Sequence, residues 1–323
     1  MKRNEPLSLT HCLNVFIEDC RTRDFSAGTL QGYRKDIGVF IDWAWRQGCV
    51  TAQAIDGALL DAYEAYLSQY QTRFGTVLKP LTRQTYLLRL YALLRWLTRQ
   101  GVITVNPAEN RPLPRGNAGV PNILSVDEMA RLMAAVDVHA PYGVRDRAIL
   151  ETLYSTGMRG QELARLIIDD LNQETGWVMI REGKGKKDRR IPIGESAVEW
   201  IQAYLTEERP KAKWARQYAE IFLSNQSRPF RSKGISALVA RYIQHAGLRE
   251  KGGSHLVRHS MAAHMLENGA DIRYIQQMLG HADLKSTQIY TQVSHPALKA
   301  VHSQTHPAKM QRKATDVEKN EDE

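Results

Sequence analysis

The stretch from Ser254 to Tyr290 carries residues that could do chemistry on a phosphate. It holds His255, Arg258, His281 and Tyr290 and shows no carboxylate cluster that would suggest a metal site. A tyrosine oxygen can attack a phosphodiester, while arginine and histidine stabilise charge on the non-bridging oxygens of the transition state. Each residue alone is more often structural, but together they predict metal-free phosphoryl transfer by a tyrosine nucleophile.

Glycines and apolar periodicity predict the helices of this stretch. Gly269 follows a helical pattern and is expected to end a first helix. Asp271 is expected to cap a second, short helix, which Gly280 ends.

These boundaries decide where the reactive side chains lie. His255 and Arg258 fall at the start of the first helix, His281 just past the end of the second, and Tyr290 in a further short element over 285–291. Helix ends leave backbone groups exposed, so side chains there can converge on an anion.

A second arginine, Arg159, stands between Gly157 and Gly160 at a predicted turn into a helix. The glycines would present its side chain, and Glu162, three residues later, could hold the guanidinium. An ordinary helix-surface ion pair, worth well under ~1 kcal/mol, is the plainer interpretation.

Residues 177–193 give the clearest β signal. Strands over 177–181 and 189–193 are predicted to flank a tip with Lys184 between two glycines, followed by Lys186 and Lys187. An amine there could contact DNA or protonate a leaving oxygen, whereas a solubilising turn would look similar. The spacing is not that of a P-loop.

The first hundred residues predict four amphipathic helices, over 6–23, 26–47, 55–70 and 82–100, that pack as a bundle. Two of them have basic faces, with these candidate DNA-binding residues: Arg34, Lys35, Arg83, Arg89, Arg95 and Arg99. A solvated helical face would also carry such charges.

Composition favours a polyanionic partner. Lysine and arginine number 44 against 35 aspartate and glutamate, a net charge of +9. The three cysteines lack framework or zinc spacing and suggest reduced thiols, hence a cytoplasmic protein. No apolar run approaches the ~20 residues of a transmembrane helix, and the N-terminus is too polar for a signal peptide.

The predicted organisation is mainly α-helical, with a small β-hairpin or sheet in the catalytic part. A helical DNA-binding domain is expected over 1–107, a Pro- and Gly-rich linker over 108–121, a catalytic domain over 122–307 and a disordered tail over 308–323. Two domains joined in this way could close around a duplex as a clamp.

Four pieces therefore stand in order along the chain: Arg159 in TGMRGQEL, Lys184 in GKGKKDRRIPI, His255 and Arg258 in HLVRH, and His281 and Tyr290 in LGHADLKSTQIY. This order closely resembles the tyrosine recombinases (the phage integrase family), and especially their XerC/XerD-like type. The resemblance covers nearly the whole chain, and the ordered set is highly specific although no single motif is. It implies a helical SAM-like core-binding domain followed by a tyrosine recombinase catalytic domain.

The resemblance also implies a role for each matched residue. Tyr290 would be the nucleophile that forms a 3′-phosphotyrosine bond, Lys184 the acid for the leaving 5′-oxygen, and His255 an aid to proton transfer at the nucleophile. Two arginines, Arg159 and Arg258, would clamp the scissile phosphate.

Two further matched positions complete the set implied by the resemblance. His281 would hydrogen-bond the phosphate, and Glu162 would support the first arginine. No cofactor, metal or ATP is expected.

The function implied is site-specific recombination between double-stranded DNA sites, by a homotetramer or with a related recombinase, and without a membrane. The segment over about 293–306 could pack on a neighbouring protomer or on its own domain. A type IB topoisomerase-like enzyme and a non-catalytic DNA-binding regulator are the alternatives.

Overall fold

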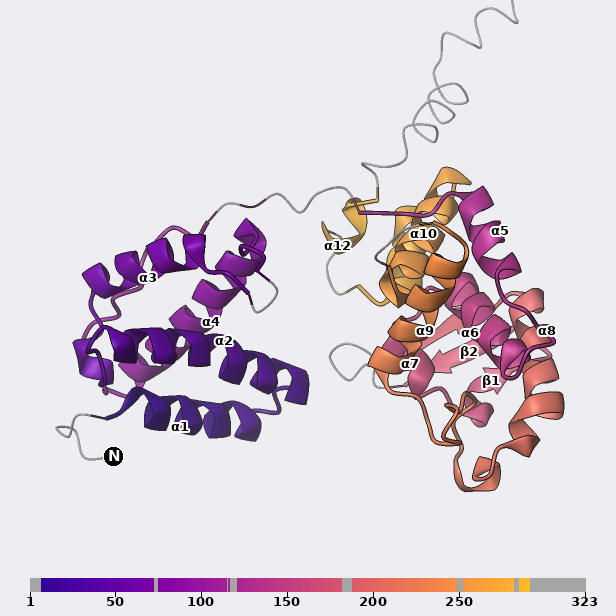
Figure 1. Ribbon diagram of the computed structural model, residues 1–323, viewed down its shortest axis with the longest axis horizontal. Helices are drawn as coiled ribbons and strands as arrows, with labels where there is room; N and C mark the ends of the chain where they lie inside the picture. Colours follow the sequence, from indigo (N-terminus) through magenta and orange to yellow (C-terminus); the bar gives the residue numbers. More distant parts are fainter. Residues whose placement is uncertain are drawn as a thin grey trace, which may run out of the picture. The chain divides into compact units, whose positions relative to one another are not determined.

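The computed structural model describes residues 7–72, 75–114, 116, 121–181, 188–248, 252–281 and 285–290. Its contacts divide the chain into two compact units, Met1–Gly119 and Val120–Glu323. The first unit consists of helices, and the second combines helices with a small sheet (Figure 1). The prediction of a mainly helical fold with a small antiparallel sheet is therefore confirmed.

The N-terminal unit is built on four long helices, close to the predicted ranges. They are α1 (Leu9–Thr22), α2 (Ala27–Arg46), α3 (Gly57–Gln69) and α4 (Pro80–Arg99), with a 3-10 turn η1 (Ala52–Ala54) between α2 and α3. Their apolar stripes meet in one core, where the rings of Phe40 and Tyr63 pack edge to face with centroids 4.9 Å apart. Apolar periodicity alone is sufficient to specify such a bundle.

Part of the predicted linker packs on this bundle. Ala108 is buried in its core, and the Arg111 guanidinium donates to Asp61 and Glu64 of α3. The N-terminal unit thus continues past residue 107.

The second unit has a helical framework around α10. Its α-helices are α5 (Val126–Ala134), α6 (Gly143–Thr156), α7 (Gly160–Ala164), α8 (Glu195–Ala203), α9 (Ser232–His245), α10 (Ser254–Glu267), α11 (Ile272–Leu279) and α12 (Lys285–Gln288). Shorter turns are η2 (Ile168–Asp170), η3 (Tyr204–Glu208), η4 (Arg209–Lys211) and η5 (Ala215–Gln217). Helix α10 packs against α6, α9 and α11. It therefore holds together the elements that surround the candidate site.

The sheet has the order β1 (Leu171–Asn172), β2 (Trp177–Ile180), β3 (Arg189–Pro192), with antiparallel pairs throughout. The predicted hairpin is confirmed, and Ile180–Arg189 is the residue pair nearest to its tip. The hairpin tip lies outside the described residues. Strand β1 was not predicted, since two residues are too short to show a β pattern.

Within the described residues, no helix has both the length and the apolar character needed to cross a membrane.

Candidate active site

Helix α10 presents three polar side chains in its first two turns. His255, Arg258 and His259 stand at positions i, i+3 and i+4, which share one face of a helix. Arg258 is buried, His259 half-buried and His255 exposed. A buried cation is thereby held on the same helix face as two imidazoles, whose ring centroids are 6.5 Å apart.

A glycine brings Arg159 to this face. Helix α6 ends at Gly157, whose φ of 60° is left-handed, and a Cβ there would lie 1.8 Å from the Met261 side chain of α10. Only glycine allows so close an approach at this φ. The Gly157 carbonyl accepts from Arg258 Nη1 at 2.6 Å, and Arg159 follows as the N-cap residue of α7.

Glu162 holds Arg159 in place, as the spacing predicts. Its carboxylate accepts from the Arg159 backbone N at 2.7 Å and from Arg159 Nη1 at 2.9 Å. The same carboxylate accepts from both Nη atoms of Arg189, at 2.9 and 2.8 Å. One buried carboxylate therefore orients two arginines.

The C-terminal end of α11 lies among the arginines, at the left-handed residue Gly280 (φ 62°). Three guanidinium groups donate to three successive carbonyl oxygens: Arg189 Nε to Met278 (3.0 Å), Arg258 Nη2 to Leu279 (2.7 Å) and Arg159 Nη2 to Gly280 (3.4 Å). We call this arrangement the carbonyl clamp. The last carbonyls of a helix lack intrahelical partners and carry partial negative charge, so cations stabilise them.

His281 follows the clamp and connects it to α12. Its Nε2 lies 3.1 Å from Arg258 Nη2, and its Nδ1 lies 2.9 Å from the hydroxyl of Thr287, which is buried. Because a guanidinium can only donate, Nε2 accepts, and Nδ1 then carries the proton. Donation from Nε2 to a phosphate oxygen would need the other tautomer or the charged ring.

Tyr290 lies just after α12 rather than within it. Its side chain is 1% exposed and packs with Met261, Ala262 and Ile275. Its hydroxyl lies 2.8 Å from Nδ1 of His259. The imidazole at the tyrosine oxygen is thus His259, whereas His255 was the residue expected to assist there.

Burial sets the charge states of these groups. It lowers the pKa of Arg258 to about 10, an effect that the nearby Arg159 strengthens, so Arg258 stays charged at neutral pH. Burial raises the pKa of Tyr290 although Arg258 and Arg159 oppose it, so the phenol keeps its proton. Burial also lowers the pKa of His259, and the charges of His255 and Arg258 add to this. A protonated phenol therefore rests beside a neutral imidazole and a field of positive charge.

The structure gathers most of the predicted catalytic residues. Two of them, Arg159 and Arg258, bind adjacent carbonyls at the end of α11, and Arg258 also contacts His281. The supporting Glu162 accepts from Arg159, and Tyr290 contacts His259, the residue next to Arg258. The exposed ring of His255 lies beside that of His259, with centroids 6.5 Å apart, and partial burial and the charges of Arg258 and Arg159 lower the pKa of His255. The predicted lysines of the hairpin tip, Lys184, Lys186 and Lys187, lie outside the described residues.

The predicted DNA-binding residues of the N-terminal unit divide into two groups. Arg34, Lys35, Arg95 and Arg99 are exposed, and Arg83 and Arg89 are half-buried. Arg89 forms an ion pair with Asp36, whose side chain is buried. Its guanidinium already has an anionic partner, so the exposed members are better placed to meet a phosphate.

Three residues of the site were missed from the sequence. His259 stands in the HLVRH motif, but one imidazole there is as plausible a proton acceptor as another. Arg189 looks like one more basic residue of the hairpin, and Thr287 carries no signal. Only the i+4 spacing of His259 from His255 could have indicated that it belongs to the same face.

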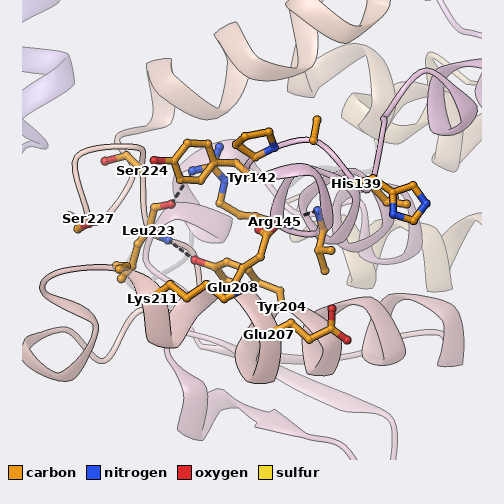
Figure 2. A pocket seen from close by; sticks show the side chains of 15 residues that line it. His139, Tyr142, Arg145, Tyr204, Glu207, Glu208, Lys211, Leu223, Ser224 and Ser227 are labelled. Carbon is orange, nitrogen blue, oxygen red and sulfur yellow. Dashed lines mark hydrogen bonds between the residues drawn. The ribbon is translucent and has the colours of Figure 1, made fainter.

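A separate cavity of about 470 Å³ lies between the start of α6 and the turn over Tyr204–Glu208 (Figure 2). Its wall includes Arg145, which is buried and donates to Asp146 and to the Leu223 carbonyl. The Glu208 carboxylate accepts from the backbone N of Arg145. The polar groups named here satisfy one another, and none of the candidate catalytic residues that the structure describes lines the cavity.

The comparisons with known proteins agree on one family. The model of the "Phage integrase family" matches residues 122–296. "Tyrosine recombinase XerC 2" of Ralstonia nicotianae is 39% identical over 95% of this chain and 88% of its own length. "Tyrosine recombinase XerD" of Listeria monocytogenes is 32% identical over 88% of this chain and 94% of its own.

The fold matches as well. A crystal structure of the XerH site-specific recombinase bound to palindromic difH substrate, a post-cleavage complex, aligns with a TM-score of 0.67. The alignment covers 92% of this chain and 84% of that one, at 23% identity. This similarity shows the fold, and membership of the family rests on the sequence relatives and the family model.

Proposed function

This chain belongs to the phage integrase family, the tyrosine recombinases, and we propose that it recombines specific DNA sites with Tyr290 as its nucleophile. The Tyr290 oxygen attacks the scissile phosphorus, the P–O5′ bond breaks, and a 3′-phosphotyrosine and a free 5′-hydroxyl form. The reverse attack by a 5′-hydroxyl from a second site rejoins the strands. The covalent bond conserves the linkage, so ligation needs no ATP.

The convergence of Arg159 and Arg258 on adjacent carbonyls, with the Tyr290 hydroxyl held by His259, the residue next to Arg258, carries this proposal. Each arginine can turn N–H donors to a non-bridging oxygen, where negative charge develops in the transition state. His281 adds a further donor in its Nε2-protonated form, and Lys184 gives the proton that the 5′-oxygen needs. His255 lies at the exposed edge of the same field and assists there.

The described arrangement is a resting state in this mechanism. Tyr290 is 1% exposed, so no DNA phosphate reaches its oxygen without a shift of Tyr290 or of the residues packed on it. His259 and the apolar neighbours hold the phenol until DNA engages the unit. The exposed basic residues of α2 and α4 hold the flanking duplex through its phosphates.

Strand exchange requires two sites and four strand cleavages, so the working species is a tetramer on DNA, formed by this chain or with a related recombinase. The reaction belongs to the cytoplasm, where the buried and unpaired Cys12, Cys20 and Cys49 stay reduced.

Cleavage in the presence of EDTA should proceed at an unchanged rate, because the charge stabilisation comes from side chains.

Covalent capture tests the proposal. The protein is mixed with a pool of nicked duplexes of random sequence, and SDS-stable adducts are isolated and sequenced. Wild-type protein should enrich one site, and Tyr290→Phe should give no adduct while it still shifts the enriched duplex in a gel. Loss of duplex binding in Tyr290→Phe would instead assign the tyrosine a structural role, and no wild-type adduct from any pool would favour the regulator.

Two differently labelled copies of the enriched site then separate recombination from topoisomerase activity. A recombinase joins the two labels in one product. Relaxation of a supercoiled plasmid without joint products would support the type IB alternative.

A further inference from the structure

Arg189 makes more contacts within the site than its place in the sequence suggests. It is the first residue of β3 and its side chain is 12% exposed. Its two Nη atoms donate to the two oxygens of Glu162, and its Nε donates to the Met278 carbonyl of α11. All three nitrogens of one guanidinium are thereby engaged, on two elements distant in sequence.

Both partners of Arg189 in turn position predicted catalytic residues. Glu162 holds the backbone and the Nη1 of Arg159. Met278 opens the carbonyl clamp, whose next carbonyls are bound by Arg258 and Arg159 and lead directly into His281. A shift of Arg189 would therefore move Glu162 and the end of α11 together.

The pairing of Arg189 with Glu162 is planar and bidentate, and this fixes the orientation of both groups. An arginine fork matches a carboxylate along two parallel hydrogen bonds, which a lysine ammonium cannot reproduce. The strong hydrogen bonds from Arg189, with those from Arg159, also keep Glu162 ionised although it is buried. A neutral or displaced Glu162 would let the Arg159 guanidinium turn away.

We infer that Arg189 is a positioning residue for strand cleavage, which acts by fixing Arg159 through Glu162 and the end of α11. It does not itself touch the scissile phosphate. The inference rests on the proposed function, since it assigns Arg159 to that phosphate. It adds a second arginine, from the β-hairpin, to the support of the first.

The experiment measures single-turnover cleavage of the enriched nicked duplex by Arg189→Ala, Arg189→Lys and Arg190→Ala. Arg190 is the matched control, because it adjoins Arg189 on β3 but is exposed and stacks on Trp177 at 4.9 Å. Arg189→Ala should keep its affinity for the duplex and cleave about 100-fold more slowly, as expected of small misplacements in a site. Arg189→Lys should remain slow, and Arg190→Ala should cleave at the wild-type rate.

A second substrate tests the route of action. A methylphosphonate at the scissile position lacks the charge that Arg159 neutralises, so the defect of Arg159→Ala should shrink on it. The defect of Arg189→Ala should shrink to a similar extent. A 5′-bridging phosphorothiolate, whose leaving thiolate needs no proton, should rescue neither variant.

The outcomes separate the two claims. Wild-type cleavage rates in Arg189→Ala, or a defect equally large on the methylphosphonate, would overturn the inference and leave the proposed function intact. Rescue by the phosphorothiolate would also overturn it, because Arg189 would then act through the hairpin lysine. No wild-type adduct on any duplex would instead refute the proposed function.

Discussion

Arg258 is a cation with almost no access to water. Its guanidinium donates to the carbonyls of Gly157 and Leu279 and lies beside His281, so it is held by backbone acceptors rather than by a carboxylate. Its charge is therefore not neutralised within this set of contacts. A phosphate is the kind of ligand that would complete it.

Removal of Arg159 should slow cleavage without loss of the fold. Arg159→Ala deletes a donor to the developing negative charge, at a cost of about 3–4 kcal/mol in the barrier by analogy with an oxyanion donor. The single-turnover rate on the nicked duplex measures this cost, and circular dichroism checks the fold. Cleavage by Arg159→Ala at the wild-type rate would remove this arginine from the mechanism.

The contribution of Glu162 to the free energy of unfolding should depend on pH. Burial alone would raise its pKa, but hydrogen bonds from Arg189 and the Arg159 backbone lower it from 4.5 to about 2. A carboxyl with a lowered pKa stabilises the fold above its unfolded value and loses that effect as pH falls through its folded value. The difference corresponds to roughly 3 kcal/mol.

Urea unfolding of wild type and Glu162→Gln between pH 6 and pH 2.5 measures this contribution. The stability gap between the two proteins should narrow as pH falls below 4.5. A gap that stays constant with pH would show that the carboxylate charge is not what Glu162 supplies.

His259 should act in a different pH window. Its pKa lies below the ordinary 6.5, because of burial and then the charges of His255 and Arg258. The unfolded chain therefore binds the proton more readily, so stability is full above pH 6.5 and declines as pH falls below it. His259→Gln should flatten this decline, whereas His139→Gln, at an exposed position, should leave it unchanged. Urea midpoints at pH 5, 6 and 7.5 provide the comparison.

At the scale of elements, the site is fixed by where helices stop. Gly157 ends α6 and Gly280 ends α11, both in left-handed conformation, and the candidate catalytic residues Arg159 and His281 follow within two residues of each stop. Asp271 caps α11 as expected, through its bond to the Arg273 backbone N at 2.7 Å. Helix termination is therefore the link between the sequence and the geometry of the site.

Gly280→Ala should damage the site more than the same change at Gly247. Both residues have a left-handed φ, 62° and 63°, so both variants lose about 1 kcal/mol or more from backbone strain. A Cβ on Gly280 would also meet the Arg189 guanidinium at 3.0 Å, while none of the described atoms lies within 4 Å of one on Gly247. Thermal unfolding and cleavage rates of the two variants should show similar destabilisation but slower cleavage only for Gly280→Ala. Equal cleavage rates in the two variants would argue against a role of the carbonyl clamp in cleavage.

The helices and the hairpin could be predicted because their signals are local. Apolar spacing, the caps at Asp271 and Gly280, and the alternation over 177–193 each depend on neighbours in sequence. The two-residue strand β1 and the position of Tyr290 after α12 carry no such signal. The Arg189–Glu162 and His259–Tyr290 contacts join elements far apart in the chain, and a single sequence does not encode which of several basic residues makes them.

At the scale of the whole molecule, the excess of positive charge should make DNA binding steeply dependent on salt. Each phosphate contact contributes about −0.9 to the slope of log affinity against log salt. Arg95 and Arg99 are exposed neighbours on α4, so the double change to Gln should reduce the slope by about 2.

A matched double change at the C-terminal end of α1 serves as the control for charge. Arg21 and Arg23 pair there with Glu18 and Asp19. Their replacement by Gln removes the same charge and should leave the slope nearly as it is. Fluorescence anisotropy from 50 to 300 mM salt measures both, and equal slopes for the two double variants would place the DNA contact elsewhere.

Before any DNA binds, the last turn of α11 offers the arginines the same kind of acceptor that a DNA phosphate offers. Oxygen dipoles of the backbone already sit against the three guanidinium groups, so mutual repulsion among those groups is overcome during folding. In the proposed mechanism an incoming phosphate meets Arg258 and Arg159 where acceptors of the same polarity now stand, while Arg189 keeps its carbonyl partner.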